Sequence, residues 1–263
     1  MVALPSTLTL FGLVLACFLG GHFVILALFS LLTRRRVAAV GGDPAGGVAL
    51  KRGARSVLAR SLQWASLRYL AEFVGAESLM LTAALRLGIV RLSPFDASSL
   101  PLLAIAYPWW ELWFYAGHRL MHTRALYPLH RPHHGATGVH RSLCFGALET
   151  VLLSAGFYVP LAVGSRVFHA VSVTTLVLTF GIAYALNVLS HLEVDLFGAR
   201  FERSRWRHAF NSTRYHSQHH RSARGNFGLN SPWFDRLFGT RLGDTHTVSR
   251  EAPSSVTAAT GSA

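Results

Sequence analysis

The sequence predicts an all-α protein that is integral to a membrane, a helical bundle of about four to five spans with two hairpins. A histidine-rich helical cap is expected on its cytoplasmic side. Two observations on composition support this class: 51% of the 263 residues are hydrophobic and only 14% are charged, whereas soluble domains carry about a quarter of charged residues. The third observation is that the apolar residues gather in runs long enough to cross a bilayer.

The clearest of these runs covers residues 8–32 and is interrupted only by two glycines and His22. It ends at three consecutive arginines, Arg34 to Arg36. No basic residue precedes the run and no small-residue cleavage site follows it, so we expect an uncleaved anchor rather than a signal peptide. The positive-inside rule places the arginines in the cytoplasm.

Four further runs follow in the sequence, at residues 69–90, 100–117, 147–163 and 167–189. The first of the four is weak because acidic residues interrupt it. The last two are joined by a short turn predicted at residues 164–166. Each consecutive pair is interpreted as a hairpin that leaves the cytoplasmic side and returns to it, so the chain is expected to be cytoplasmic after residues 117 and 189.

Three parts of the chain are expected. Residues 1–68 form the anchor and a basic cytoplasmic connector, residues 69–243 form the histidine-bearing domain, and residues 244–263 form a disordered tail of small and polar residues. The formal net charge is +13, which is typical of partners such as nucleic acid or an anionic membrane surface. The hydropathy favours the membrane and argues against nucleic acid.

Nine of the 14 histidines follow the ends of these runs in a regular pattern. Spacings of three and four residues place side chains on one face of a helix. Such pairs and triplets occur at His118 and His122, at His130, His133 and His134, and at His216, His219 and His220, with His191 standing alone at the end of the last run. His22, His169 and His246 lack helical partners, and His140 and His208 lie near a cluster without completing one.

Neutral imidazole is a good ligand for zinc, copper, iron and nickel. Nine histidines exceed the coordination shell of one ion, so the pattern predicts two ions with four or five nitrogen ligands each. No HExxH motif of the zinc hydrolases occurs. The outer ring nitrogens need hydrogen-bond acceptors. Carboxylates near the clusters are candidates for this role, or equally for ion pairs with arginines: Glu111, Glu149, Glu193 and Asp195.

At this point the sequence resembles the fatty acid hydroxylase / sterol desaturase superfamily of membrane di-iron enzymes. The resemblance covers roughly residues 100–240 and consists of an HxxxH box at residues 118–122, HxxHH boxes at residues 130–134 and 216–220, and a tail with Asn226-Phe227-Gly228 and residues 233–240. The residue before the first box is Glu111, where the family more often has Asp, and the tail has one additional residue, Phe234.

The resemblance implies that the nine histidines hold two iron ions and that O2 is a co-substrate. The implied reaction is hydroxylation or desaturation of a lipid-like substrate, such as a sterol or a fatty acyl chain, in lipid biosynthesis. Zinc can replace iron in purified samples by affinity alone. No HPGG haem box occurs in the sequence, so the electrons are expected from a separate ferredoxin, rubredoxin or cytochrome b5-type donor with its reductase.

Two other classes of protein use similar ligands. One is a membrane zinc-dependent hydrolase or isomerase, and the other is a metal transporter or sensor, although transporters place their ligands near the bilayer midplane. An aromatic run between residues 107 and 115 is interpreted either as the lining of a substrate entry or as an ordinary interfacial belt. It comprises Tyr107, Trp109, Trp110, Trp113, Phe114 and Tyr115.

Overall fold

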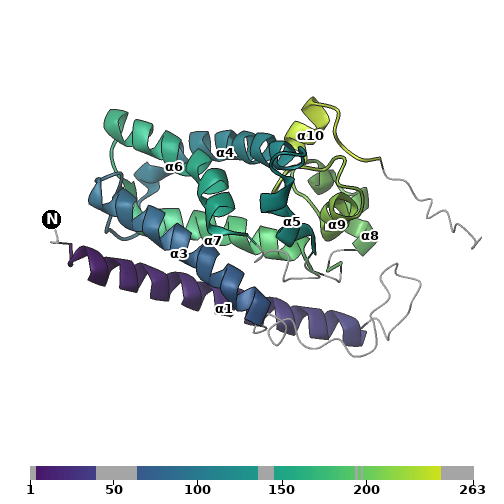
Figure 1. Ribbon diagram of the computed structural model, residues 1–263, viewed down its shortest axis with the longest axis horizontal. Helices are drawn as coiled ribbons and strands as arrows, with labels where there is room; N and C mark the ends of the chain where they lie inside the picture. The colour runs from purple at the N-terminus through teal and green to yellow at the C-terminus, as the bar shows by residue number, and fades with distance from the viewer. Residues whose placement is uncertain (1–3, 40–63, 136–144, 193–194, 197, 244–263) are drawn as a thin grey trace, which may run out of the picture.

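A computed structural model describes residues 4–39, 64–135, 145–192, 195–196 and 198–243 of the chain. The chain is mostly helical, as predicted, with one very short parallel strand pair (Figure 1). Its elements are α1 (Thr7–Ala39), α3 (Trp64–Arg86), β1 (Val90–Arg91), η2 (Ala97–Ser99), α4 (Leu100–Met121), α5 (Tyr127–Gly135), α6 (Ala147–Val167), β2 (Val171–Ser172), α7 (Val173–Ser190), α8 (Gly198–Arg203), η4 (Arg205–His208), α9 (Thr213–Ser222) and α10 (Trp233–Leu237).

The five long helices form a bundle, and the short helices other than η2 gather at one end of it (Figure 1). Helix α6 packs against both α3 and α4, while α1 packs against α3 and α7. The two predicted hairpins correspond to α3 with α4 and to α6 with α7. Their helices make their most extensive contacts between the two hairpins rather than within either one. We call the end that carries α5, α8, η4, α9 and α10 the cap; the N-terminus lies at the opposite end.

The end opposite the cap is held together by hydrogen bonds between two connections. Strand β1 follows α3 and pairs with β2, which precedes α7. The Ser172 hydroxyl donates to the carbonyl oxygen of Ser93 at 3.1 Å, and the Ser172 amide donates to the Ser99 hydroxyl at 3.0 Å. The Arg86 guanidinium donates to the carbonyl oxygen of Pro5. These contacts set the positions at which α1, α4 and α7 begin. They therefore also set where α4 and α7 end along the long axis of the bundle.

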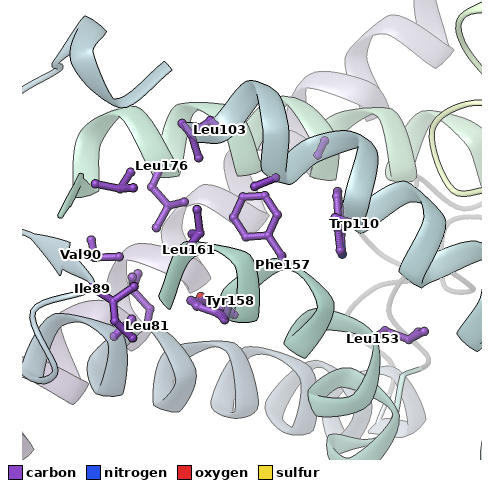
Figure 2. Close-up of a cluster of buried hydrophobic side chains, with 14 of the residues drawn as sticks. Leu81, Ile89, Val90, Leu103, Trp110, Leu153, Phe157, Tyr158, Leu161 and Leu176 are labelled. Atoms are coloured by element: carbon purple, nitrogen blue, oxygen red, sulfur yellow. The ribbon is translucent and has the colours of Figure 1, made fainter. Parts of the chain in front are cut away.

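The apolar core lies between α1, α3, α4, α6 and α7. Phe157 of α6 is at its centre, with its ring centroid 5.6 Å from Trp110 and 4.4 Å from Phe180, both edge-on (Figure 2). The two helices α4 and α6 approach closely at Gly156, where an added Cβ would lie 2.1 Å from the Trp113 ring. The Trp113 indole cannot move freely because its N–H donates to the carbonyl oxygen of Leu152 at 2.8 Å.

Three helices in the described part of the chain are long and apolar enough to cross a membrane: residues Thr7–Arg35 of α1, all of α6 and all of α7. Helices α3 and α4 occupy the other two apolar runs, and each contains a buried glutamate, Glu77 and Glu111. The five predicted runs thus coincide with five long helices. The number of these that span a membrane stays a prediction.

The turn predicted at residues 164–166 is wrong, because α6 continues to Val167 and the chain turns only after it. Gly164 serves packing instead: a Cβ there would lie 2.3 Å from Leu102 of α4. The proposed boundary between residues 68 and 69 falls inside α3. Most of the connector (residues 40–63), His140, Glu193 and the tail from residue 244, with His246, lie outside the described residues.

Replacing Gly156 by alanine should destabilise the bundle by about 1–3 kcal/mol, because the Trp113 ring must move to admit a methyl group. Gly75 of α3 is a matched control, since nothing lies within 4 Å of its added Cβ. Gly75→Ala should be neutral or stabilising by up to about 1 kcal/mol, from helix propensity alone. Thermal unfolding of both variants in one detergent checks this; equal shifts of the midpoint would contradict the close contact.

Candidate metal centre

Four segments bring the nine histidines into the cap. His118 lies in the last turn of α4 and His122 directly follows that helix. Helix α5 carries the first triplet and α9 the second, while His191 directly follows α7. Ser212 caps the N-terminus of α9, because its hydroxyl accepts a hydrogen bond from the Tyr215 amide at 3.2 Å. The capped start sets the register that turns all three of its histidines inward.

The histidines form two neighbouring groups. Each ring offers one nitrogen, and within each group these atoms all lie within 4.8 Å of one another. The first group, called here the five-histidine group, consists of His118, His122, His130, His134 and His219. The second, the four-histidine group, consists of His133, His191, His216 and His220. Helices α5 and α9 contribute to both groups, so the two groups are joined through the same two helices.

The separations between ring nitrogens match those expected around a metal ion. In the five-histidine group, Nε2 of His118 and His130 are 3.0 Å apart, and Nε2 of His134 is 3.2 Å from that of His219. In the four-histidine group the spacing of Nε2 atoms runs from 2.8 to 3.4 Å. Nitrogens bound about 2.1 Å from one ion are about 3.0 Å apart at right angles and about 3.4 Å apart in a tetrahedron.

The outer nitrogens show which ring atom carries the proton. Nδ1 of His118 donates to the carbonyl oxygen of Phe227 at 2.7 Å, and Nδ1 of His219 donates to that of Gly225 at 2.8 Å. Nδ1 of His191 donates to the carbonyl oxygen of Asn187 at 2.7 Å. A carbonyl oxygen can only accept, so Nδ1 holds the proton and Nε2 of a neutral ring presents a lone pair to the group.

One carboxylate also serves as an outer acceptor. Nδ1 of His130 donates to Oε1 of Glu149 at 2.6 Å, and both side chains are about 1% exposed. The lone pairs of His118 and His130 then face each other across 3.0 Å, an arrangement that is repulsive unless a cation lies near both. This donor set fits a metal ion bound by each group, because the ring nitrogens of each group converge and four of the rings, His118, His130, His191 and His219, have their outer proton held by an acceptor.

Six of the nine rings, His118, His122, His130, His133, His216 and His219, have a lowered pKa and are neutral at physiological pH, as metal ligands must be. Burial lowers the pKa of His122 to about 4 and, together with neighbouring histidines, that of His130 to about 2. Burial lowers the pKa of His219 to about 3, although its hydrogen bond to Gly225 acts in the opposite direction. The pKa values of His133 and His216 lie well below the ordinary value for the same reasons, burial first.

A buried aspartate holds the loop that orients His118. The Asp235 carboxylate accepts from the amides of Phe227 and Gly228 at 2.9 and 2.6 Å and from the Tyr215 hydroxyl at 2.7 Å. A Cβ at Gly228 would lie 2.2 Å from the carbonyl oxygen of Ser231, so only glycine fits there. The tail motif noted in the sequence therefore positions the Phe227 carbonyl, a function that its spacing alone did not reveal.

The other predicted acceptors have different roles. Glu111 accepts from the amide and hydroxyl of Ser231 at 3.1 and 2.8 Å, and so anchors the loop before α10 to α4. Asp195 is half-buried beyond α7. Of the carboxylates proposed for this role, Glu149 is shown to contact a histidine. Sequence reasoning could not find the carbonyls of Asn187, Gly225 and Phe227, because backbone acceptors carry no residue-specific signal.

The remaining described histidines lie apart from both groups. His169 is exposed in the connection before β2, and His208 is exposed at the end of η4, where it contacts Arg236. His22 lies within α1 and is hydrogen-bonded to Tyr184. The separation agrees with the absence of helical partners noted for His22 and His169.

An apolar cavity of about 520 Å³ lies within the bundle, and two aromatic side chains of its lining contact histidines of the two groups. Phe145 in its wall stacks on His133 with ring centroids 4.5 Å apart, and Phe114 lies 5.4 Å from His118. Asn187, whose carbonyl holds His191, also lines it.

The aromatic side chains between residues 107 and 115 do not all have the same surroundings. Trp110 and Phe114 face the cavity, Trp109 and Trp113 are largely exposed, Tyr107 is half-buried, and Tyr115 packs against Phe227, Phe234 and Phe238.

Comparisons with known proteins agree with this geometry. The chain is 31% identical over 135 residues to methylsterol monooxygenase 1 of Danio rerio and 30% identical over 143 residues to that of Gallus gallus. Each alignment covers 49% of this chain, and 43% and 42% of the relative, so the chain matches less than half the length of these relatives. No solved structure matches significantly.

A family model described as fatty acid hydroxylase matches residues 103–240, slightly more than half of the chain. This range contains all nine histidines, Glu149 and the Asp235 loop. The chain therefore belongs to the fatty acid hydroxylase family, within the fatty acid hydroxylase / sterol desaturase superfamily.

Proposed function

We propose that this chain is a membrane-bound di-iron oxygenase that hydroxylates or desaturates a lipid-like substrate with O2. The observation that carries the proposal is the pair of largely buried histidine groups beside an apolar cavity, with the outer protons of four of the rings held by acceptors. The relatives are named methylsterol monooxygenases, which supports a sterol or similar lipid as the substrate class. The names of these relatives do not favour the alternative, a zinc-dependent hydrolase or isomerase.

The residues of the chain orient and protect the reacting atoms. When bound, iron supplies the activation of O2 and the removal of hydrogen from an unactivated C–H bond. The carbonyls of Phe227, Gly225 and Asn187 hold three rings in one tautomer and one orientation. His118, His130, His133 and His219 are almost fully buried, which keeps water away from this part of the site.

The cavity is proposed as the site of the lipid. Its volume of about 520 Å³ lies within the range of roughly 300–1,000 Å³ that is usual for small-molecule sites. Its walls are apolar side chains from α1, α3, α4, α6 and α7, so a lipid chain can enter from the bilayer without leaving an apolar medium. Phe114 and Phe145 line this space and contact His118 and His133, so they form the part of its wall beside which a substrate carbon would approach the histidines.

The proposed orientation places the cap in the cytoplasm. The C-terminal part of α1, with Arg34 and Arg35, lies at the cap end, as the positive-inside rule requires. Seven of the described arginines in the cap and its connecting segments are exposed: Arg124, Arg131, Arg200, Arg203, Arg205, Arg221 and Arg224. This surface favours an acidic electron donor of the ferredoxin, rubredoxin or cytochrome b5 type, whose delivery of electrons should slow as ionic strength rises.

Removal of one ligand should cost more metal in the four-histidine group than in the five-histidine group. His216→Ala leaves three ligands, whereas His118→Ala leaves four. We expect about two metal ions per chain in the unaltered protein, about one in His216→Ala and an intermediate value in His118→Ala. Elemental analysis of purified protein measures this, with the exposed His169→Ala as the control. Two ions retained in both variants would show that these histidines are not ligands.

Loss of the acceptor beyond His130 should weaken metal binding without removing a ligand. Glu149→Leu leaves the Nδ1 proton of His130 buried without an acceptor, and the affinity for metal should fall about 10- to 100-fold. Glu149→Gln keeps an amide oxygen in place and should lose much less. Competition with a chelator measures both affinities. Equal affinities in the leucine and glutamine variants would argue against the hydrogen bond as the cause.

The reaction itself is tested by comparing the lipids of cells with and without the gene by mass spectrometry. Hydroxylation adds one oxygen to a single lipid class, and desaturation removes two hydrogens from it. The difference should disappear in cells that express His216→Ala. Unchanged lipids, or turnover that proceeds without O2 on tightly bound zinc, would refute the proposed function.

A further inference from the structure

A polar atom without a hydrogen-bond partner faces the apolar cavity from α1. His22 is 4% exposed and lines the cavity. Its Nδ1 is hydrogen-bonded to the Tyr184 hydroxyl at 2.6 Å, which ties α1 to α7. Its Nε2 is buried and finds no partner among the described residues. Such an atom is costly to bury, so the molecule that fills the cavity is expected to provide the missing hydrogen bond.

We propose that His22, held by Tyr184, binds the hydroxyl group of a lipid alcohol. This inference rests on the proposed function, because it takes the cavity as the lipid site. A hydroxyl group both donates and accepts, so it satisfies Nε2 in either tautomer of the ring. A hydrocarbon can do neither. No arginine or lysine lines the described part of the cavity, so a carboxylate or phosphate would be buried there without a counter-charge.

Glu77 is a second polar side chain in the same wall. It is also 4% exposed, and the Ser154 hydroxyl donates to its Oε1, while Oε2 has no partner among the described residues. Trp110 and Asn187 in the same lining also have a buried polar atom without a partner among the described residues. These open polar atoms distinguish the cavity from one shaped for a hydrocarbon alone. The imidazole is the better anchor because its orientation is held by Tyr184, which itself stacks on Phe73 at 6.0 Å.

The position of the anchor restricts where the lipid is oxidised. Tyr184 precedes His191 by seven residues in α7, which corresponds to about 10 Å along the helix. A hydroxyl bound at His22 is therefore remote from the histidine groups, and the oxidised carbon is not adjacent to the carbon that bears the hydroxyl. His22 and Glu77 both precede residues 103–240, so this selectivity belongs to the part of the chain outside the family match.

The test compares lipid alcohols with their deoxy counterparts. Binding to purified, metal-loaded protein is measured for two matched pairs, cholesterol with cholest-5-ene and 1-octadecanol with octadecane. The alcohol of at least one pair should bind about tenfold more tightly than its hydrocarbon, the effect of one hydrogen bond. Equal affinities within both pairs would overturn the proposal.

Variants assign the preference to a residue. His22→Phe keeps a ring of similar size and should abolish the tenfold preference while leaving the affinity for the hydrocarbon unchanged. Tyr184→Phe frees the imidazole and should reduce the preference to about two- to threefold. His169→Phe, outside the cavity, should change nothing. A preference that survives His22→Phe but disappears in Glu77→Met would also overturn the assignment to His22.

The outcome is separable from the proposed function. Unchanged binding of the hydrocarbon and unchanged metal content show that a variant is folded, and if His22→Phe fails this check, Tyr184→Phe and the comparison in the unaltered protein still decide. If the chain oxidises no lipid but binds the alcohol more tightly, the oxygenase proposal fails and the anchor stands. If it oxidises lipids and binds alcohol and hydrocarbon equally, only the anchor fails.

Discussion

The structure depends on the packing of nine imidazoles in two groups, in which neighbouring inner nitrogens lie about 3 Å apart. Lone pairs at such distances repel, and the repulsion is relieved when a cation lies between them. The outer protons must meanwhile be accepted, or the rings would turn. The carbonyls of Asn187, Gly225 and Phe227 and the Glu149 carboxylate supply these acceptors. The cap therefore needs both the bundle and the C-terminal loop in place.

The bundle sets the positions of the histidines along its long axis. His118 and His191 lie at the cap ends of α4 and α7, and the opposite ends of these helices are joined through Ser172 and Ser99. The close approach of α4 and α6 at Gly156 brings Glu149, at the start of α6, to His130. Asp235 then ties the last loop to α9. Packing far from the histidines thus determines the geometry of the site.

Under the proposed function, one cavity would connect the histidine groups to a lipid. Its apolar walls come from all five long helices, and its inner end is closed by aromatic rings that touch the histidines. The reactive end is built from the segment shared with the family, whereas α1 and α3 line the remote end and carry the open polar atoms of His22 and Glu77. Chemistry and selectivity are therefore contributed by different parts of the chain.

The sequence by itself determined the helical class, the positions of the five apolar runs and the nine histidines that gather in the cap. It could do so because helix periodicity and bilayer length are local properties of the chain. Only the tertiary structure decided how the histidines divide, since His133 and His134 are neighbours in sequence but belong to different groups. It also decided which acceptors are used, because backbone carbonyls have no side-chain signature, and that Gly164 packs against Leu102 rather than forming a turn.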